Sequence, residues 1–282
     1  MNIYHEDSAI RFSNIDQSDT LTIASTFDLF QEAAISHAEI LGVGREAMKQ
    51  SGHVWILSRL SVFMSARPGY REKITTRTWP RGANKLFAIR DYDIYYSSDI
   101  SGHEEGPCHS EALVRGRSAW LVVDLEKHRP LRPQTAVETL PANNGINALP
   151  GEKQEGNDPP PSLPARDFTG FNPIPRRASN SDIDYNGHVN NTRYIQWIQD
   201  LLDPEIVIKA KQLRLDINYL AEVLYGETIA LYIMPIDKNP LPEGSPLQLQ
   251  MPLHCTAAFA IEGRRGEGKE TVPVFRAELI TG

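Results

Sequence analysis

The chain has 282 residues, enough for two domains of ordinary size, and 40% hydrophobic with 23% charged residues is the composition of a globular protein with a sizeable core. Its formal net charge of -7 argues against binding nucleic acid or an anionic membrane through bulk charge. The N-terminus lacks the pattern of a signal peptide and no apolar stretch is long enough to span a bilayer, so we expect a cytoplasmic protein.

The first half predicts one apolar helix followed by an antiparallel sheet. TFDLFQEAAISHAEILGVG places Phe27, Phe30, Ala34 and Leu41 at helical spacing and ends in glycines. We expect His37 on this helix to pack or bond locally. Four runs rich in branched and aromatic residues follow, separated by Pro and Gly turns: VWILSRLSVFMSA, KITTRTWP, LFAIRDYDIYY and RGRSAWLVVDL.

The chain has only two cysteines, Cys108 and Cys255, which fits a reducing compartment and excludes a disulfide framework. In GHEEGPCHSE, His103 and His109 flank Cys108 as conceivable metal ligands. No second ligand group accompanies them, so we favour a polar loop and predict no metal.

A proline-rich linker divides the chain. Eight of its 20 prolines lie between Pro130 and Pro164, in a stretch with almost no apolar periodicity. We expect residues 134–167 to cross the surface without regular structure and with little to bury. The division gives an N-terminal domain of residues 1–133 and a C-terminal domain of residues 168–282.

The second half repeats the plan of the first. A helix in VNNTRYIQWIQDLL precedes runs typical of strands: KQLRLDINYL, ETIALYIMPI, LQLQMPLHCTAAFAI and VPVFRAEL. At a constant offset of 155, Tyr70 aligns with Tyr225 and Glu72 with Glu227. Such self-similarity indicates a duplicated domain. We therefore predict an α+β protein of two tandem hot-dog domains, each an antiparallel sheet wrapped around one long helix.

The most distinctive segment, SDIDYNGHVNN, comes directly before the second helix. Asp184, Asn186 and His188 alternate, so an extended segment would place them on one face, next to the free N–H groups of a helix start. Such a group could polarise an ester carbonyl and orient water. Alternatively, Asp and Asn are common helix caps and Asn-Gly is a turn dipeptide. The corresponding first-half segment, SDTLTIASTFDLF, has no Asn-x-His, which favours a chemical role and suggests that the trio has no counterpart there.

Glu222 is the second candidate. The internal alignment places it opposite Arg67, so the two halves have opposite charges at the end of one strand. The alternative is a strand-edge carboxylate paired with a surface base, which the position alone does not exclude.

The segment SDIDYNGHVNNTRYIQWI resembles the active-site motif of the plant and bacterial acyl-ACP thioesterases, in which Asp-x-Asn-x-His-Val-Asn-Asn opens the second hot-dog helix. The likeness extends over nearly the whole chain, including LFQEAAISHAEILGVG, SAWLVVDLEKHRP and LRLDINYLAEVLYGE. It implies hydrolysis of the thioester of a fatty acyl chain on acyl carrier protein, without a cofactor.

The resemblance implies that Asp184, Asn186, His188 and Glu222 form the catalytic group. Glu222 and His188 would orient or deprotonate water, Asn186 and helix-start N–H groups would hold the thioester oxygen, and Asp184 would orient its neighbours. The residue after the glutamate is often Cys in the plant enzymes. Here it is Val223, so water and not a thiol must attack.

The resemblance also implies that the first domain holds the acyl chain, with Phe27, Phe30, Ile56 and Leu86 as candidate walls. These residues could equally be core. An acidic carrier protein requires a basic patch on this protein. The candidates near the motif are Arg176, Arg177, Arg193, Lys209, Lys211 and Arg214. Alternatively, these residues are simply solvated surface.

Three alternatives remain open at this point. The chain could be a hot-dog acyl-CoA thioesterase or a dehydratase, although no His and acid pair of the dehydratase arrangement stands out. It could also be a non-catalytic acyl-binding module, but no output element such as a helix-turn-helix is visible. The fused halves could satisfy each other or form a homodimer.

Overall fold

The structure is a computed structural model that describes residues 3–100, 111–137, 140–141, 145–149, 157–236, 256–266 and 271–282. Its strands are β1 (Tyr4–Ala9), β2 (His53–Met64), β3 (Lys73–Asn84), β4 (Phe87–Tyr96), β5 (Val114–Asp124), β6 (Arg129–Leu131), β7 (Ile174–Arg177), β8 (Leu213–Tyr219), β9 (Thr228–Pro235), β10 (Ala257–Arg265) and β11 (Val272–Thr281). Its α-helices are α1 (Ile23–Ile40), α2 (Arg45–Gln50), α3 (Pro133–Ala136), α4 (Asn191–Asp200) and α5 (Pro204–Lys209), and its 3-10 turns are η1 (Phe12–Asn14), η2 (Ser97–Asp99) and η3 (Asn180–Asp182).

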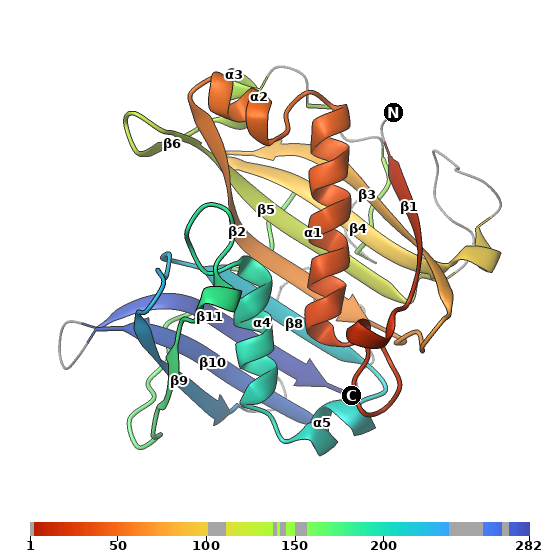
Figure 1. The fold of residues 1–282 in the computed structure, drawn as a ribbon, viewed down its shortest axis with the longest axis vertical. Coiled ribbons are helices and arrows are strands. Elements are labelled where there is room, and N and C mark those ends of the chain that lie inside the picture. Colours follow the sequence, from red (N-terminus) through yellow and green to blue (C-terminus); the bar gives the residue numbers. More distant parts are fainter. Residues whose placement is uncertain are drawn as a thin grey trace.

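One antiparallel sheet of 11 strands runs through both halves, and α1 and α4 lie on the same face of it (Figure 1). The strand order is β1-β3-β4-β5-β2-β8-β11-β10-β9-β7, with β6 added beside β5. Read outward from the central pair β2–β8, each half has the same order. This confirms the predicted α+β fold of two tandem units, each a sheet around one long helix.

Each long helix begins at a capped turn and buries one face. The Thr22 side chain accepts a hydrogen bond from the Ser25 N–H at the start of α1, and the Asn190 side chain accepts one from the Thr192 N–H at the start of α4. Phe30 of α1 is buried against Gly116 of β5. A Cβ at Gly116 would lie 2.4 Å from the Phe30 ring, so this close packing needs glycine there. In the described part of the chain, no helix is long and apolar enough to cross a membrane.

The two halves meet along a strand pair and a helix pair. β2 and β8 are paired from Arg59↔Asn218 to Met64↔Leu213, which makes the sheet continuous. Above it, the Ala24 N–H at the start of α1 donates to Gln199 Oε1 of α4 at 2.7 Å. The halves therefore form one body with a shared apolar core.

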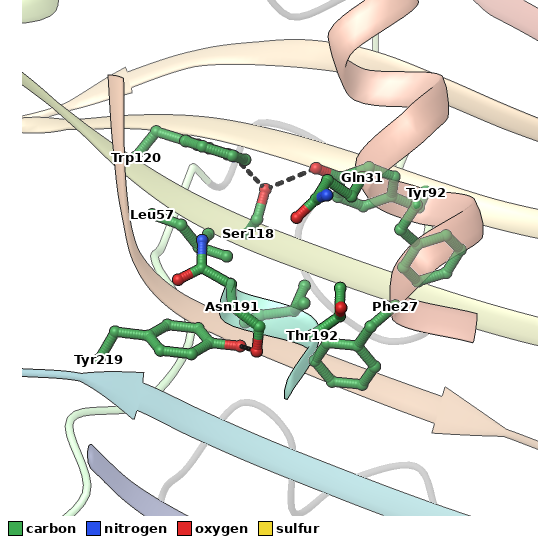
Figure 2. A pocket seen from close by; sticks show the side chains of 11 residues that line it. Phe27, Gln31, Leu57, Tyr92, Ser118, Trp120, Asn191, Thr192 and Tyr219 are labelled. Carbon is green, nitrogen blue, oxygen red and sulfur yellow. Dashed lines mark hydrogen bonds between the residues drawn. The ribbon is translucent and has the colours of Figure 1, made fainter. Parts of the chain in front are cut away.

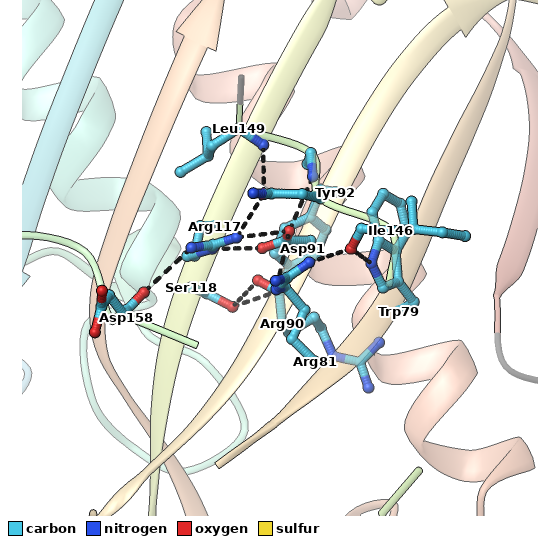
Figure 3. Close-up of polar contacts among 12 residues, drawn as sticks. Trp79, Arg81, Arg90, Asp91, Tyr92, Arg117, Ser118, Ile146, Leu149 and Asp158 are labelled. Carbon is cyan, nitrogen blue, oxygen red and sulfur yellow. Dashed lines mark hydrogen bonds and ion pairs between the residues drawn. The ribbon is translucent and has the colours of Figure 1, made fainter. Parts of the chain in front are cut away.

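The described parts of the linker differ from the expectation that they have little to bury. Apart from α3 they have no helix or strand, as predicted, but Ile146, Ala148, Leu149 and Leu163 are buried. Residues 145–149 lie on the sheet face opposite α1 (Figure 3). We call these five residues the strap.

Buried polar groups of the sheet hold the strap. Asp91 accepts hydrogen bonds from the Arg117 guanidinium at 2.7 and 2.9 Å and from the Ala148 N–H at 3.0 Å. Trp79 Nε1 donates to the Ile146 carbonyl at 3.2 Å, and Arg81 donates to the same oxygen (Figure 3). The sequence pattern concealed this because prolines and polar residues surround the few apolar residues that are buried.

Candidate active site

Residues 183–189 form a tight turn directly before α4, so the expectation of an extended segment is wrong. Ile183 and Val189 form an antiparallel bridge, and the Asp184 N–H donates to the His188 carbonyl at 2.8 Å. Gly187 has a φ of 84°, which glycine adopts without strain. The turn chemistry of Asn-Gly therefore prevails over alternation, and Asp184, Asn186 and His188 do not share one face of a strand.

His188 and Glu222 are the predicted residues that the structure brings into contact. His188 Nε2 lies 3.2 Å from Glu222 Oε2, and their side chains are 33% and 59% exposed. The contact follows from the backbone, because the Val189 N–H donates to the Val223 carbonyl at 2.8 Å and His188 forms a bridge with Leu224. The pair is positioned by main-chain bonds and remains accessible to an incoming substrate.

Asp184 and Asn186 are close in the chain but do not join this pair. Asp184 Oδ1 accepts the Asn186 N–H at 2.8 Å, which stabilises the turn, and Asn186 is exposed. In the described part of the chain, no hydrogen bond connects either side chain to His188 or Glu222.

Groups around Glu222 hold the segment that follows β8. Arg265 Nη1 donates to the Glu222 carbonyl at 3.0 Å and lies 3.3 Å from both Glu227 carboxylate oxygens. The Tyr194 phenol oxygen accepts a hydrogen bond from the Val223 backbone, and burial raises the pKa of Tyr194, so the phenol stays protonated at neutral pH. Arg265 and Tyr194 were not singled out from the sequence.

The first half contains the same turn with different side chains. Ile15 and Leu21 form a bridge like that of Ile183 and Val189, and the Ser18 N–H donates to Asp16 Oδ1 at 2.9 Å, as the Asn186 N–H does to Asp184. Asp184 therefore does have a counterpart, Asp16, contrary to the sequence expectation. The equivalent bridges Thr20↔Gly69 and His188↔Leu224 place Thr20 where the second half has His188.

The strand ends that face these turns show which residues are common to both halves. Glu72 accepts the Gly69 N–H at 2.6 Å, and Glu227 accepts the Leu224 N–H at 2.7 Å, so this glutamate belongs to the turn. Arg67, in contrast, replaces Glu222 in the first half. Its guanidinium donates to Asp16 Oδ2 at 2.9 Å and to the Val207 carbonyl at 3.1 Å. The duplicated scaffold thus requires the aspartate but neither His188 nor Glu222.

A small cavity lies between α1, the sheet and the start of α4 (Figure 2). Phe27 and Phe30 line it, as predicted for an acyl pocket, but Ile56 and Leu86 do not. Ile56 is half-buried on β2, and Leu86 is 38% exposed at a turn. The volume is about 20 Å³, room for one water molecule, so an acyl chain requires side chains here to move.

Several other predicted residues have structural roles. Arg214 is buried and paired with Asp216 at 2.8 Å, so it cannot contribute to a docking patch. Lys209 pairs with Glu205 at 2.7 Å on the surface of α5, where its side chain stays exposed. His37 is buried against Arg90, whose Nη1 lies 3.1 Å from His37 Nδ1, which agrees with local bonding.

The conceivable metal ligands His103, Cys108 and His109, and also Cys255, lie outside the described residues. Among the residues that are described, no three His, Cys, Asp or Glu side chains are grouped to hold a metal ion.

Known proteins of one family resemble this chain. The palmitoyl-acyl carrier protein thioesterase of Cuphea hookeriana is 23% identical over 228 residues, which are 78% of this chain and 52% of that protein. The oleoyl-acyl carrier protein thioesterase 1 of Arabidopsis thaliana is 24% identical over 217 residues, or 72% and 56% of the two chains. The chain thus spans about half the length of the curated relatives it matches.

Solved structures share the fold over its full extent. The acyl-ACP thioesterase of Bacteroides thetaiotaomicron has a TM-score of 0.76 at 22% identity and covers 100% of this chain and 98% of its own. The 12:0-ACP thioesterase of Umbellularia californica has a TM-score of 0.73 at 15% identity, covering 99% and 93%. The profile of the acyl-ACP thioesterase N-terminal domain matches residues 1–137 and that of the C-terminal domain residues 171–256. With both domains matched in order, the chain belongs to the acyl-ACP thioesterase family.

Proposed function

We propose that this protein hydrolyses the thioester between a fatty acyl chain and acyl carrier protein, releasing the free fatty acid. The observation that carries the proposal is the contact of His188 with Glu222 in the segment before α4. The start of α4 itself lines a cavity to which both halves contribute. The first half, residues 1–133, receives the acyl chain, and residues 168–282 carry the reacting groups, with residues 134–167 between them.

In the proposed reaction, Glu222 accepts a proton from water while His188 orients it, and the water oxygen bonds to the thioester carbon. The C–S bond then breaks and the departing sulfur takes up a proton. No metal or organic cofactor takes part. Val223 is buried and carries no thiol, so its position offers no alternative nucleophile.

The thioester oxygen needs hydrogen-bond donors, and α4 limits the choice. The Thr192 N–H is bound by the Asn190 side chain at 2.9 Å and the Arg193 N–H by the Asn190 carbonyl at 2.9 Å. The Asn191 N–H is the one left among the first three of the helix in the described part of the chain. We assign it to the oxyanion together with the exposed Asn186 amide.

Glu222→Gln tests the proposal. Because a positioned base is lost, turnover of acyl carrier protein thioesters should fall about 10²- to 10⁴-fold. The surface variant Glu205→Gln is a matched control that should keep wild-type turnover, as should Cys108→Ala and Cys255→Ala. Steady-state rates on carrier and CoA thioesters of several chain lengths, with circular dichroism as a fold check, provide the measurement. Near-normal hydrolysis by folded Glu222→Gln, or an indispensable cysteine, would contradict the mechanism.

The same assay addresses the carrier. Preference for CoA thioesters over carrier-protein thioesters would favour an acyl-CoA thioesterase, and binding of acyl thioesters without turnover would favour a non-catalytic module. Of the predicted bases, all except the buried Arg214 remain candidates for the carrier-docking surface near the motif. Arg177 and Lys211 are exposed, whereas Arg176 is half-buried and lies 3.7 Å from Asp200. We also propose a homodimeric assembly, to be tested by the mass of the particle in solution.

A further inference from the structure

The cavity beside α4 contains polar side chains that the proposed hydrolysis does not use. Phe27, Phe30, Leu57 and Leu60 give it an apolar wall, as a hydrocarbon chain requires. Two amides also reach it, Gln31 from α1 and Asn191 from α4 (Figure 2). Polar groups that interrupt an apolar pocket usually recognise a polar atom of the ligand.

Gln31 is one of several polar residues on the inner face of its helix, together with the buried Thr26 and His37. It lies four residues after Phe27, and this spacing puts both side chains on the face that packs against the sheet. Within the described residues its amide has no hydrogen-bond partner, although the side chain is half-buried. A polar group in such a place costs free energy unless water or a ligand binds it.

Three further side chains that line the cavity, Tyr92, Ser118 and Trp120, together have one donor hydrogen more than their mutual hydrogen bonds use. Trp120 Nε1 donates to Ser118 Oγ at 2.7 Å, and Ser118 Oγ lies 3.0 Å from the Tyr92 hydroxyl (Figure 2). These bonds use two of the three donor hydrogens. Within the described residues, the one further acceptor for this third hydrogen is the Arg90 carbonyl, at 3.5 Å from Ser118 Oγ, and that is a poor bond. The cavity therefore offers hydrogen-bond donors next to an apolar wall.

The cavity also lies at the start of α4, a few residues along the chain from His188. Asn191 and Thr192, which line it, follow directly on the turn that carries His188. A ligand atom beside Gln31 and Ser118 would therefore belong to the thioester end of an acyl chain and not to its tail.

We propose, on the basis of the hydrolase function above, that this cavity selects acyl chains with a hydroxyl or oxo oxygen near the thioester, and that Gln31 is the specificity-determining residue. The Gln31 amide and the spare hydroxyl donor of the Tyr92–Ser118–Trp120 group bind that oxygen. The apolar wall holds the adjoining carbons.

The test compares saturated and 3-hydroxyacyl thioesters of equal length on the same carrier protein. Wild type should have the higher kcat/KM for the 3-hydroxyacyl substrate. In Gln31→Met, which keeps the length of the side chain, the ratio of the two kcat/KM values should fall about 2- to 10-fold, as expected for the loss of one hydrogen bond. Gln31→Leu provides a second apolar replacement.

Gln196→Met is the matched control, because the Gln196 amide accepts a bond from Arg193 at 2.8 Å on α4 and does not line the cavity. Its ratio should equal that of wild type. Hydrolysis of both substrates without preference overturns the inference alone. An equal loss of kcat/KM on both substrates in Gln31→Met does so too, and would assign Gln31 to the pantetheine arm that the substrates share. Hydrolysis of neither substrate overturns the proposed function as well.

Discussion

Individual side chains in the duplicated turn distinguish scaffold from chemistry. Asp16 and Asp184 accept equivalent N–H groups at 2.9 and 2.8 Å, so a carboxylate is needed to shape the turn in either half. His188 and Glu222 are replaced by Thr20 and Arg67, and the turn persists. The contact at 3.2 Å between His188 and Glu222 therefore does not arise from folding requirements alone.

Paired substitutions of the two aspartates test this separation. Asp16→Ala and Asp184→Ala each remove the acceptor of one turn, and each should lower the free energy of unfolding by about 1 kcal/mol, as for a lost side-chain cap. Asp16 also loses its ion pair with Arg67, so its loss should be no smaller. Only Asp184→Ala should also lower kcat, because its turn carries His188. Urea unfolding and steady-state kinetics on both variants decide this, and equal kinetic losses would refute the assignment of chemistry to one half.

Much of this site could be predicted from the sequence, and the failures have local causes. Resemblance to the family and comparison between the halves identified Asp184, Asn186, His188 and Glu222 as candidates, and their roles stay predictions. The backbone around them was wrongly expected to be extended, although Asn-Gly is a turn signal. Gln31 was missed because a polar residue on a helix carries no motif by itself, and its significance depends on the cavity walls opposite it.

At the scale of elements, the strap shows how composition can mislead. Its neighbourhood is rich in prolines, yet Ile146 and Ala148 pack in a buried cluster with Ile3 and Trp79. The Arg117–Asp91 pair below is almost completely buried, and removing one partner of such a pair leaves an uncompensated charge. The local sequence shows that the strap is not a helix or strand. It cannot show that the strap is buried, because the residues it packs against are distant in the chain.

Ile146→Ala measures how firmly the strap is held. Loss of this buried side chain should lower the free energy of unfolding by about 2–4 kcal/mol, as for other large-to-small changes in a core. Ser162→Ala, at an exposed position of the same linker, should change it by less than about 0.5 kcal/mol. Urea titrations followed by tryptophan fluorescence suit this comparison because Trp79 lies in the cluster. Equal stability of the two variants would restore the expectation of a linker with little to bury.

At the scale of the whole molecule, the two halves depend on each other for both sheet and site. The internal offset of 155 predicted the repeated order of elements, which the strand order confirms. It could not predict that β2 and β8 pair, because two similar domains can associate in several ways. That pairing and the α1–α4 contact bring the start of α4 against the first-half helix, so the cavity has walls from both halves.

Separating the halves should therefore abolish activity that their recombination restores. Residues 157–282 contain His188 and Glu222 but lack α1, β2 and β5, which supply most of the cavity wall. Alone, this fragment would expose the edge of β8 and the apolar face of α4, and residues 1–156 would expose β2 and α1, so each should aggregate or associate with itself. Co-expressed, the fragments should copurify in equal amounts and hydrolyse acyl carrier protein thioesters, since pairing of β2 with β8 completes the sheet. Gel filtration with rate measurements on each preparation tests this. If residues 157–282 alone turn over substrate at the rate of the intact chain, the first half is not needed for acyl binding and the proposed division between the halves is wrong.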